Sequence, residues 1–275
     1  MNKKMIVADD TTLVITTYNN PPFLELVLKG VLRQQVMPCE VIIADDGSTS
    51  ETKELIERYK KCFPVPLIHS WIPDEGFRAA KSRNVAISKA HGEYIITIDG
   101  DIVISPSFVK DHVAAREPGY FINGSRSRLM EKATRKRCAS LDPRFSVFTI
   151  GLKRPMNLLR IPWLHRLVKG AKGIDKIRGC NMSFWKADIV AVNGFEERFV
   201  GWGCEDTELV DRFYNIGLKR KNIKGLAPCV HLYHPKAAVN YKTHKANIPI
   251  REETERLHKT RADKGLDQYL SSSSS

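Results

Sequence analysis

Short apolar runs alternate with segments of helical spacing along residues 11–124 of the chain. Runs of about four to eight apolar or β-branched residues between turn signals predict buried strands. Apolar residues three and four positions apart predict the helices between them. Strands are predicted at Leu13–Thr17, Val41–Ala44, Leu67–Trp71, Tyr94–Ile98 and Tyr120–Gly124, and helices at 23–35, 51–61, 78–90 and 106–115. The alternation predicts an α/β fold with a mostly parallel central sheet flanked by helices.

The second half of the chain is less regular. It contains a predicted strand at 181–185, a glycine-rich and aromatic loop at 195–203, a helix at 205–216 and a short strand at 230–234. We expect a single domain over residues 1–270. Its predicted parts are a nucleotide-binding α/β half (11–124), a basic helical insert (125–178), a second half (179–250) and a C-terminal helix (251–270). The serine run at 271–275 is low-complexity and is assigned no structure.

Composition narrows the class of protein. The chain has 275 residues, of which 42% are hydrophobic, which is enough for a sizeable core. No apolar run approaches the roughly 20 residues of a membrane span, and the first residues lack the apolar segment of a signal peptide. Six cysteines are scattered without a C-x-x-C pair, which is typical of reduced thiols. We therefore expect a cytoplasmic protein.

Positive charge is concentrated in one segment. The net charge is +13, and residues 126–178 hold fifteen lysines and arginines against three acids. Such a segment predicts an anionic partner, namely a membrane surface, an acidic polymer or nucleic acid. Within it, residues 145–168 mix apolar and basic residues with two prolines. Two interpretations stay open: a pair of short helices packed on the core, or an interfacial segment lying on an anionic bilayer.

Two carboxylates end the strand predicted at 94–98. Asp99 and Asp101 are separated by one glycine. Open α/β sheets bind ligands at the carboxyl ends of their strands, and hard divalent cations prefer oxygen ligands. A solvated turn is the alternative for an Asp-x-Asp pair, but the buried strand before it favours a metal site. The pair predicts a cation that neutralises the diphosphate of a nucleotide sugar.

The second half offers further candidates. Glu205 and Asp206 begin a helix whose dipole favours charged carboxylates, so either could serve as a general base or simply cap the helix. Trp202 could stack on a sugar ring or fill the core. His231 and His234 could supply a further metal ligand. Three cations at the start of another predicted helix could hold phosphate: Arg78, Lys81 and Arg83.

These motifs together resemble a known family. Thr16-Thr-Tyr-Asn19, Asp45-Asp-Gly-Ser48, Arg78 with Ser82-Arg-Asn84, and Asp99-Gly-Asp101 resemble the family 2 glycosyltransferases of the GT-A fold. Residues 178–185 and 201–206 resemble the C-terminal region of β-1,4-galactosyltransferases and of bacterial chondroitin polymerase domains. The resemblance covers residues 11–124 and 177–235 and leaves the basic insert uncovered. It implies a Rossmann-like GT-A fold and a sugar transferase.

The resemblance also implies roles for individual residues. Thr16, Tyr18 and Asp46 would contact uracil, Arg78 would lie near the nucleotide or diphosphate, and Asp99 would contact ribose or metal. Asp101 would bind Mn²⁺ or Mg²⁺, with His231 as the remaining ligand and His234 as the less favoured choice. Asp206 would be the catalytic base, with Glu205 and Trp202 near the acceptor sugar.

The leading hypothesis is a metal-dependent inverting transferase. It would move a hexose or N-acetylhexosamine from a UDP-sugar to a bacterial surface glycan, such as lipopolysaccharide core, O-antigen or capsule, with a β-linkage. The acceptor would be lipid-linked or an oligosaccharide, and the enzyme would be peripheral on the inner face of the cytoplasmic membrane. The alternatives are a nucleotidyltransferase that makes nucleotide sugars, and a non-enzymatic binder of anionic polymers or membranes. Nucleic acid is not expected as a partner, because the aromatic-basic interleaving of single-strand binders is absent from the sequence.

Overall fold

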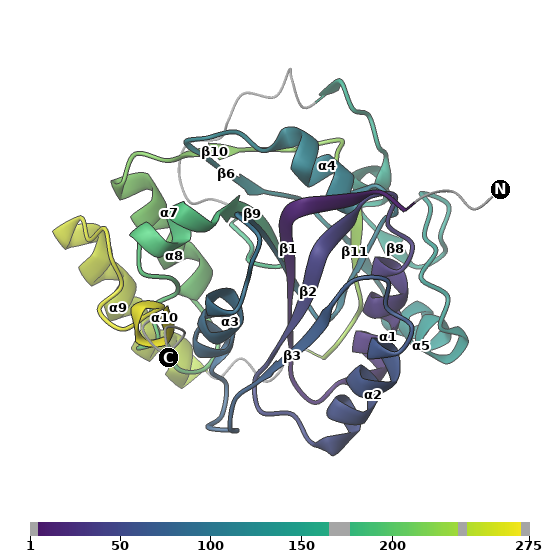
Figure 1. The fold of residues 1–275 in the computed structure, drawn as a ribbon, viewed down its shortest axis with the longest axis horizontal. Coiled ribbons are helices and arrows are strands. Elements are labelled where there is room, and N and C mark those ends of the chain that lie inside the picture. The colour runs from purple at the N-terminus through teal and green to yellow at the C-terminus, as the bar shows by residue number, and fades with distance from the viewer. Residues whose placement is uncertain (1–4, 165–176, 236–240, 271–275) are drawn as a thin grey trace.

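The computed structural model describes residues 5–164, 177–235 and 241–270, in which helices cover both faces of a central sheet (Figure 1). The strands are β1 (Val7–Thr17), β2 (Met37–Asp45), β3 (Leu67–Trp71), β4 (Tyr94–Asp99), β5 (Ile102–Ile104), β6 (Tyr120–Asn123), β7 (Ser127–Leu129), β8 (Leu152–Lys153), β9 (Asn181–Trp185), β10 (Lys219–Lys221) and β11 (Cys229–His231). The helices are α1 (Pro21–Val31), α2 (Ser50–Lys60), α3 (Ala79–Ser88), α4 (Phe108–Ala115), α5 (Glu131–Ser140), the 3-10 helix η1 (Pro155–Leu158), α7 (Lys186–Ala191), α8 (Glu205–Asn215), α9 (Tyr241–Leu257) and α10 (Asp267–Leu270).

The central sheet has seven strands in the order β10-β6-β9-β4-β1-β2-β3. Strands β4, β1, β2 and β3 pair in parallel, and β10 is parallel to β6. Strand β9 is antiparallel to both of its neighbours, β4 and β6. The predicted α/β class with a mostly parallel central sheet is therefore confirmed.

The strand register brings several chain segments to one edge of this sheet. Thr16 of β1 lies opposite Asp99 of β4, and Thr17 lies opposite Asp45 of β2. On the other side of β4, Ile98 pairs with Asn181 at the start of the antiparallel β9. The residues that follow β1, β2 and β4, and those that precede β9, consequently meet at the carboxyl edge, where open α/β sheets bind ligands.

The core lies on both faces of the sheet. Side chains alternate along each strand, so that Leu13 and Ile15 of β1 pack on one face and Val14 packs on the other. Helices α1, α2 and α4 cover the first face, whereas α3, α7 and α8 cover the second (Figure 1). Helix α1 begins locally as its sequence predicts, because the side chain of Asn20 accepts a hydrogen bond from the amide of Phe23 after two prolines.

A four-stranded sheet, in the order β5-β11-β7-β8, stands beside the carboxyl edge. Strand β11 pairs antiparallel with β5, so that His231 lies opposite Ile102, the residue after Asp101. The same strand pairs in parallel with β7, which belongs to the basic insert. This small sheet therefore joins the Asp-x-Asp segment, the histidines and the insert. The sequence analysis did not predict β5 or β7, because three-residue strands carry too short a pattern.

The basic insert is less helical than expected. Its described part contains β7, α5, β8 and η1. Over residues 145–164, where a pair of helices was one interpretation, the regular elements described are β8 and η1. Gly151 and Arg154 adopt left-handed backbone conformations there, which a continuing helix does not allow. Residues 165–176, which belong to the same predicted insert, lie outside the described residues.

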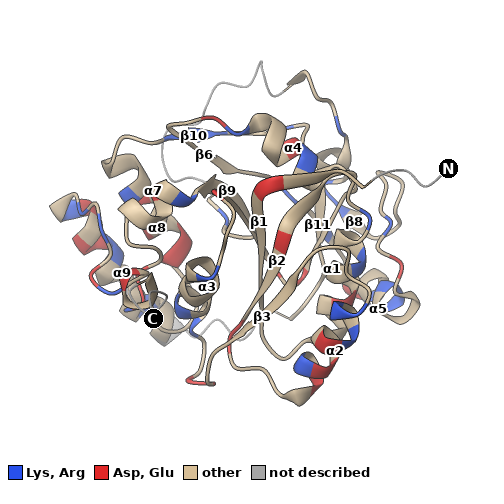
Figure 2. Ribbon diagram, viewed as in Figure 1, with Lys and Arg blue, Asp and Glu red and all other residues tan. Residues whose placement is uncertain are grey.

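The C-terminal helix is divided in two. Helices α9 and α10 replace the single helix expected at 251–270, and His258 has a left-handed backbone directly after α9. Helix α9 carries both basic and acidic residues, and its acids lie in its C-terminal half (Figure 2). It packs on α8, where Arg251 binds Asp211 at 2.9 Å. No helix in the described part of the chain is long and apolar enough to cross a membrane. Residues 271–275 lie outside the described residues.

Candidate active site

Arg83 is the centre of the polar cluster at the carboxyl edge. Its guanidinium donates hydrogen bonds to Thr16 Oγ1 at 3.1 Å, to Asp99 Oδ1 at 3.1 Å and to Asp206 Oδ1 at 3.2 Å. Glu205 Oε1 lies 3.8 Å from the same Nη1 atom. Arg83 is 5% exposed, and the surrounding carboxylates hold the pKa of its guanidinium above its ordinary value against the effect of burial. One buried cation thus links β1, β4 and α8.

Helix α3 holds Arg83 through its buried face. The neighbouring Asn84 is fully buried, donates to the carbonyl of Phe195 at 2.8 Å and accepts from the amide of the same residue at 2.8 Å. The ring of Phe195 also lies under the Arg83 guanidinium, 5.2 Å from its carbon to the ring centroid. The segment after α7 therefore fixes both residues of α3.

The acidic pair at the start of α8 faces this arginine. Asp206 Oδ2 accepts a hydrogen bond from the amide of Gly179 at 2.7 Å, so that both of its carboxylate oxygens have partners. A Cβ atom on Gly179 would lie 2.1 Å from Asp206 Oδ1, which leaves room for glycine alone. Glu205 is more buried, and burial followed by the charge of Asp206 raises the pKa of its carboxyl well above the ordinary value.

A possible metal-binding group lies on the small sheet. The ligand atoms of Asp101, His231 and His234 all lie within 4.8 Å of one another. Asp101 Oδ2 is 3.2 Å from His231 Nε2 and 3.0 Å from His234 Nε2. The other oxygen of Asp101 is buried and has no hydrogen-bond partner among the described residues. One carboxylate and two imidazoles suit a divalent cation, so these residues fit the Mn²⁺ or Mg²⁺ ion expected from the sequence.

The two histidines differ in surroundings. Burial lowers the pKa of His231 to about 4, with Asp101 acting in the opposite direction. The hydrogen bond with Asp101 raises the pKa of His234, whose side chain is 44% exposed. A neutral imidazole is the form that binds a metal, and burial favours this form at His231. Asp99 lies outside the three-ligand group, and Arg83 engages its Oδ1.

The residues predicted to contact uracil lie at another part of the carboxyl edge. Asp46 is 3% exposed; its Oδ2 accepts from the backbone amide of Arg78 at 2.8 Å, and its Oδ1 has no partner among the described residues. Burial raises the pKa of Asp46 to about 6. Tyr18 is 47% exposed and donates to Asp74 Oδ2 at 3.1 Å, while Thr16 lies between this corner and Arg83. An exposed aromatic ring beside a buried unpaired acceptor suits a planar base with an N–H edge.

Other predicted residues lie farther from the cluster. Three cations at the start of α3 were predicted to hold phosphate. Lys81 binds Glu75 at 3.0 Å, and the backbone amide of Arg78 donates to Asp46. Arg83 binds the carboxylates of the cluster. Trp202 is 54% exposed, and its ring lies 5.5 Å from that of His244. It therefore offers a free face to a ligand instead of filling the core.

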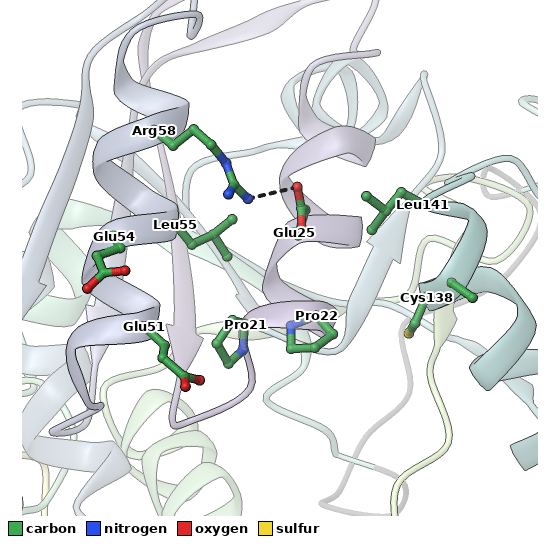
Figure 3. A pocket seen from close by; sticks show the side chains of 10 residues that line it. Pro21, Pro22, Glu25, Glu51, Glu54, Leu55, Arg58, Cys138 and Leu141 are labelled. Carbon is green, nitrogen blue, oxygen red and sulfur yellow. Dashed lines mark hydrogen bonds and ion pairs between the residues drawn. The ribbon is translucent and has the colours of Figure 1, made fainter.

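A shallow groove of about 330 Å³ lies on another part of the surface (Figure 3). It is lined by α1, α2 and α5, where Arg58 binds Glu25 at 3.0 Å. None of the candidate site residues lines it. We therefore place the chemistry at the carboxyl edge of the sheet, where the buried charges gather.

Comparison with known proteins agrees with this geometry. Residues 12–150 match the family described as glycosyl transferase family 2, which covers half of the chain. The chain belongs to glycosyl transferase family 2. Residues 166–235 of this glycosyltransferase also match a family described as the N-terminal domain of galactosyltransferase. The family resemblance inferred from the motifs is confirmed, and the nucleotidyltransferase and non-enzymatic alternatives are set aside.

Two named relatives of this family 2 enzyme are a synthase and a glucosyltransferase. The chain is 24% identical over 243 residues to chondroitin synthase of Escherichia coli. The aligned region covers 81% of this chain and 35% of the relative. The chain is 25% identical to validoxylamine A glucosyltransferase of Streptomyces hygroscopicus subsp. limoneus, over 75% of this chain and 48% of that protein. The chain thus spans between a third and a half of the length of these two relatives.

Solved structures show the same GT-A fold. TarS residues 1–349 of Staphylococcus aureus in complex with UDP-GlcNAc match with a TM-score of 0.60 and 17% identity, over 96% of this chain and 71% of that one. A mannosyltransferase of Pyrobaculum calidifontis in complex with GDP-Man and Mn²⁺ matches with a TM-score of 0.58 and 15% identity, over 96% and 68%. Both likenesses concern the fold alone.

The sequence analysis missed several residues of this family 2 site. Arg83 was one of three cations expected at phosphate, and nothing local marked it as the partner of Asp206. Gly179 had no signal beyond its place before β9. Asp45 binds His69 at 2.7 Å, and this buried pair supports the loop that carries Asp46. Each of these residues acquires its role from a partner distant in the sequence.

Proposed function

We propose that this glycosyltransferase is a divalent-metal-dependent, inverting enzyme that uses a UDP-linked hexose or N-acetylhexosamine. The acceptor would be a growing bacterial surface glycan, such as lipopolysaccharide core, O-antigen or capsule, extended through a β-linkage. The observation that carries the proposal is the convergence of two clusters at one sheet edge, namely Asp101 with its two histidines and Arg83 with Asp99 and Asp206.

The donor would lie along the carboxyl edge. Asp46 would accept the imide N–H of uracil at its unpaired oxygen, and Tyr18 would lie against the ring. Thr16 and Arg78 belong to the same corner, and Asp99 would face the ribose. Asp101, His231 and, less favoured, His234 would hold Mn²⁺ or Mg²⁺, which neutralises the leaving diphosphate when bound. The orphaned Asp101 oxygen supports this assignment.

The acceptor would approach from the side of α8. Asp206 would take the proton of the attacking hydroxyl, while Glu205 and Trp202 would contact the acceptor sugar. Arg83 and the amide of Gly179 orient the Asp206 carboxylate. One base, with no second carboxylate proposed as nucleophile, gives direct displacement and inversion at the anomeric carbon.

The decisive test is donor turnover. The enzyme is incubated with a panel of UDP-sugars and Mn²⁺, and release of UDP is measured with and without EDTA. We expect one hexose or N-acetylhexosamine donor to be hydrolysed slowly in a metal-dependent manner. In a parallel thermal-shift experiment, UDP with Mn²⁺ should raise Tm, and an oligonucleotide should not. Absence of both metal-dependent hydrolysis and UDP stabilisation would refute the proposal.

A peripheral association with the inner face of the cytoplasmic membrane is supported by the insert. Phe148 and Ile150 are 89% and 92% exposed, and Trp163 is 63% exposed. Large apolar side chains that protrude next to basic residues are typical of interfacial segments. The test is flotation with vesicles of phosphatidylcholine alone or with phosphatidylglycerol. The Phe148→Ser/Ile150→Ser variant should lose flotation, and equal partitioning of both proteins would contradict this association.

A further inference from the structure

The cations of the basic insert fall into two groups. Four arginines have acidic partners at 2.6–2.8 Å, namely Arg135 with Glu131, Arg137 and Arg144 with Asp142, and Arg160 with Asp111. A second group forms no ion pair within the described residues; its lysines are Lys132, Lys136 and Lys153, and its arginines are Arg126, Arg128, Arg154 and Arg178. The charges of the first group are neutralised by acidic residues of the fold. The charges of the second group are not neutralised in this way, so they make up the excess positive charge of the insert.

The small sheet aligns part of this second group with the metal-binding residues. Arg128 of β7 pairs in register with His231 of β11 on one side and with Lys153 of β8 on the other. Paired residues of neighbouring strands project to the same face, so the three side chains form a row. Ser127 and Leu129 project to the opposite face and are buried. The row therefore leads from the metal-binding group outward to the exposed cations.

The segments that carry the other arginines lie next to β7. The hydroxyl of Ser127, on the other face of β7 from Arg128, donates to the backbone carbonyl of Arg154 at 2.9 Å. Arg178 directly precedes Gly179, whose amide holds the proposed base Asp206. The guanidinium of Arg126 contacts the sulfur of Cys180, two residues beyond Arg178. The insert and the segment before β9 thus meet where the chain carries these four arginines.

Their charges repel one another. Burial, and then the charges of Arg126, Arg128 and Arg154, hold the pKa of Arg178 below its ordinary value. Like charges gathered without a counter-charge are unfavourable, and a bound anion removes the repulsion. Arg126 also acts on Asp99 and Asp101, so it belongs to the donor side of the cluster. Arg178 adjoins Gly179, the anchor of the proposed base, which is the side of the proposed acceptor.

We propose that Arg128, Arg154 and Arg178 form a subsite for a phosphate group carried by the acceptor. The inference rests on the proposed function and specifies the chemical class of its acceptor. Guanidinium groups bind phosphate oxygens in a fork, and a phosphate offers several oxygens to arginines that arrive from different directions. The subsite gives a role to three unpaired arginines that lie beside the metal-binding group and the anchor of the proposed base.

Binding of a defined phosphodiester tests this subsite. The probe is a fluorescent oligomer of six glycerol-phosphate units, and its Kd is measured by anisotropy in the presence of UDP and Mn²⁺. The Arg128→Gln/Arg154→Gln variant should raise this Kd by ~10-fold or more, since charged hydrogen bonds are lost. The Kd of UDP with Mn²⁺, measured by calorimetry, should change by less than about twofold.

A matched variant controls for net charge. Lys53→Gln/Lys61→Gln removes the same charge from exposed positions at α2, and it should leave oligomer binding within about twofold. An equal loss in this control would assign the binding to diffuse charge. A parallel loss of UDP affinity in the arginine variant would assign the arginines to the donor. Weaker binding only to phosphatidylglycerol vesicles, with oligomer binding intact, would assign them to a lipid surface. Failure of the wild-type protein to bind the oligomer would also overturn the inference.

These outcomes are separable from the proposed function. UDP-sugar hydrolysis tests the donor site without any acceptor, and oligomer binding tests the arginine subsite without turnover. If the enzyme hydrolyses its donor but does not bind the oligomer, the subsite alone is refuted. A protein that binds the oligomer through these arginines but shows no metal-dependent hydrolysis would refute the proposed function alone.

Discussion

Arg83 Nη1 lies 3.2 Å from Asp206 Oδ1, although 123 positions separate the two residues in the chain. The same guanidinium binds Asp99 through Nη2 at 3.1 Å. Arg83 therefore joins the end of strand β4, on the proposed donor side, to the start of helix α8, on the proposed acceptor side. One buried cation surrounded by carboxylates thus holds the ends of these two elements together.

Replacement of Arg83 should disable the site and destabilise the fold. Arg83→Gln leaves Asp99 and Asp206 without their shared cation, and loss of one partner of a buried ion pair costs about 3–5 kcal/mol. We expect a lower Tm and a loss of turnover of ~10²-fold or more. Arg83→Lys, which keeps the charge but not the fork, should recover Tm more than turnover. Normal turnover in Arg83→Gln would show that the link is dispensable.

Asp206→Asn should separate binding from transfer. The amide keeps the shape and the contact with Gly179 but cannot take a proton, so turnover should fall by ~10²-fold or more. Calorimetry with UDP and Mn²⁺ should give a nearly unchanged Kd. Glu205→Gln is the comparison, and it should raise the KM for acceptor more than it lowers kcat. If Glu205→Gln abolished turnover and Asp206→Asn did not, the base would be Glu205.

Gly179→Ala should displace the proposed base. The added methyl group would lie 2.1 Å from Asp206 Oδ1, so the carboxylate must move away. Because this movement disturbs its hydrogen bonds with Arg83 and with the amide of residue 179, we expect a lower Tm together with a large loss of kcat. UDP release and thermal unfolding measure the two effects. Equal kcat in both proteins would mean that the position of Asp206 is not critical.

The metal ligands should rank in a definite order. Asp101→Asn and His231→Gln should weaken Mn²⁺ binding in the presence of UDP by more than the ~10–100-fold typical of outer partners. His234→Gln should have a smaller effect, because His234 is the more exposed histidine. Electron paramagnetic resonance titration of free Mn²⁺ gives the affinities. His91→Gln, at an exposed position outside the ligand group, is the control. A stronger effect at His234 than at His231 would reverse the assignment.

A buried histidine should make stability depend on pH. His112 is fully buried between Ser183 and Asn181, and burial lowers its pKa from 6.5 to about 4. Between these two pH values the unfolded chain therefore binds a proton at His112, whereas the folded protein does not. The contribution of the neutral, buried His112 to the free energy of unfolding is complete above pH 6.5 and is lost as the pH falls toward about 4. This contribution amounts to about 3 kcal/mol.

Urea unfolding across this pH range measures the effect of His112. His112→Gln cannot titrate, so the free energy of its unfolding should fall less steeply on acidification than that of the wild type. His258→Asn, which replaces an exposed histidine without an acidic partner among the described residues, is the control. Parallel curves for His112→Gln and wild type would contradict the assignment.

Local patterns predicted the strands that build the carboxyl edge. The apolar run before Asp99 predicted β4, and the run before Asp45 predicted β2, because a buried strand needs little information beyond its own residues. Since parallel strands end at the same edge, the sequence also predicted that their polar ends would meet there. Strand β10, Lys219–Lys221, escaped prediction because it has no apolar residue.

The sequence by itself therefore determined the α/β fold, the Asp-x-Asp segment and the acidic start of α8, because strand burial and helix spacing act over a few residues. Only the tertiary structure decided that Arg83 binds Asp99 and Asp206, that Gly179 holds the proposed base, and that two histidines flank Asp101. It also divided the arginines of the insert into paired and unpaired groups. Such contacts depend on which distant segments the fold brings together, and charge interactions carry no periodic pattern that a sequence can display.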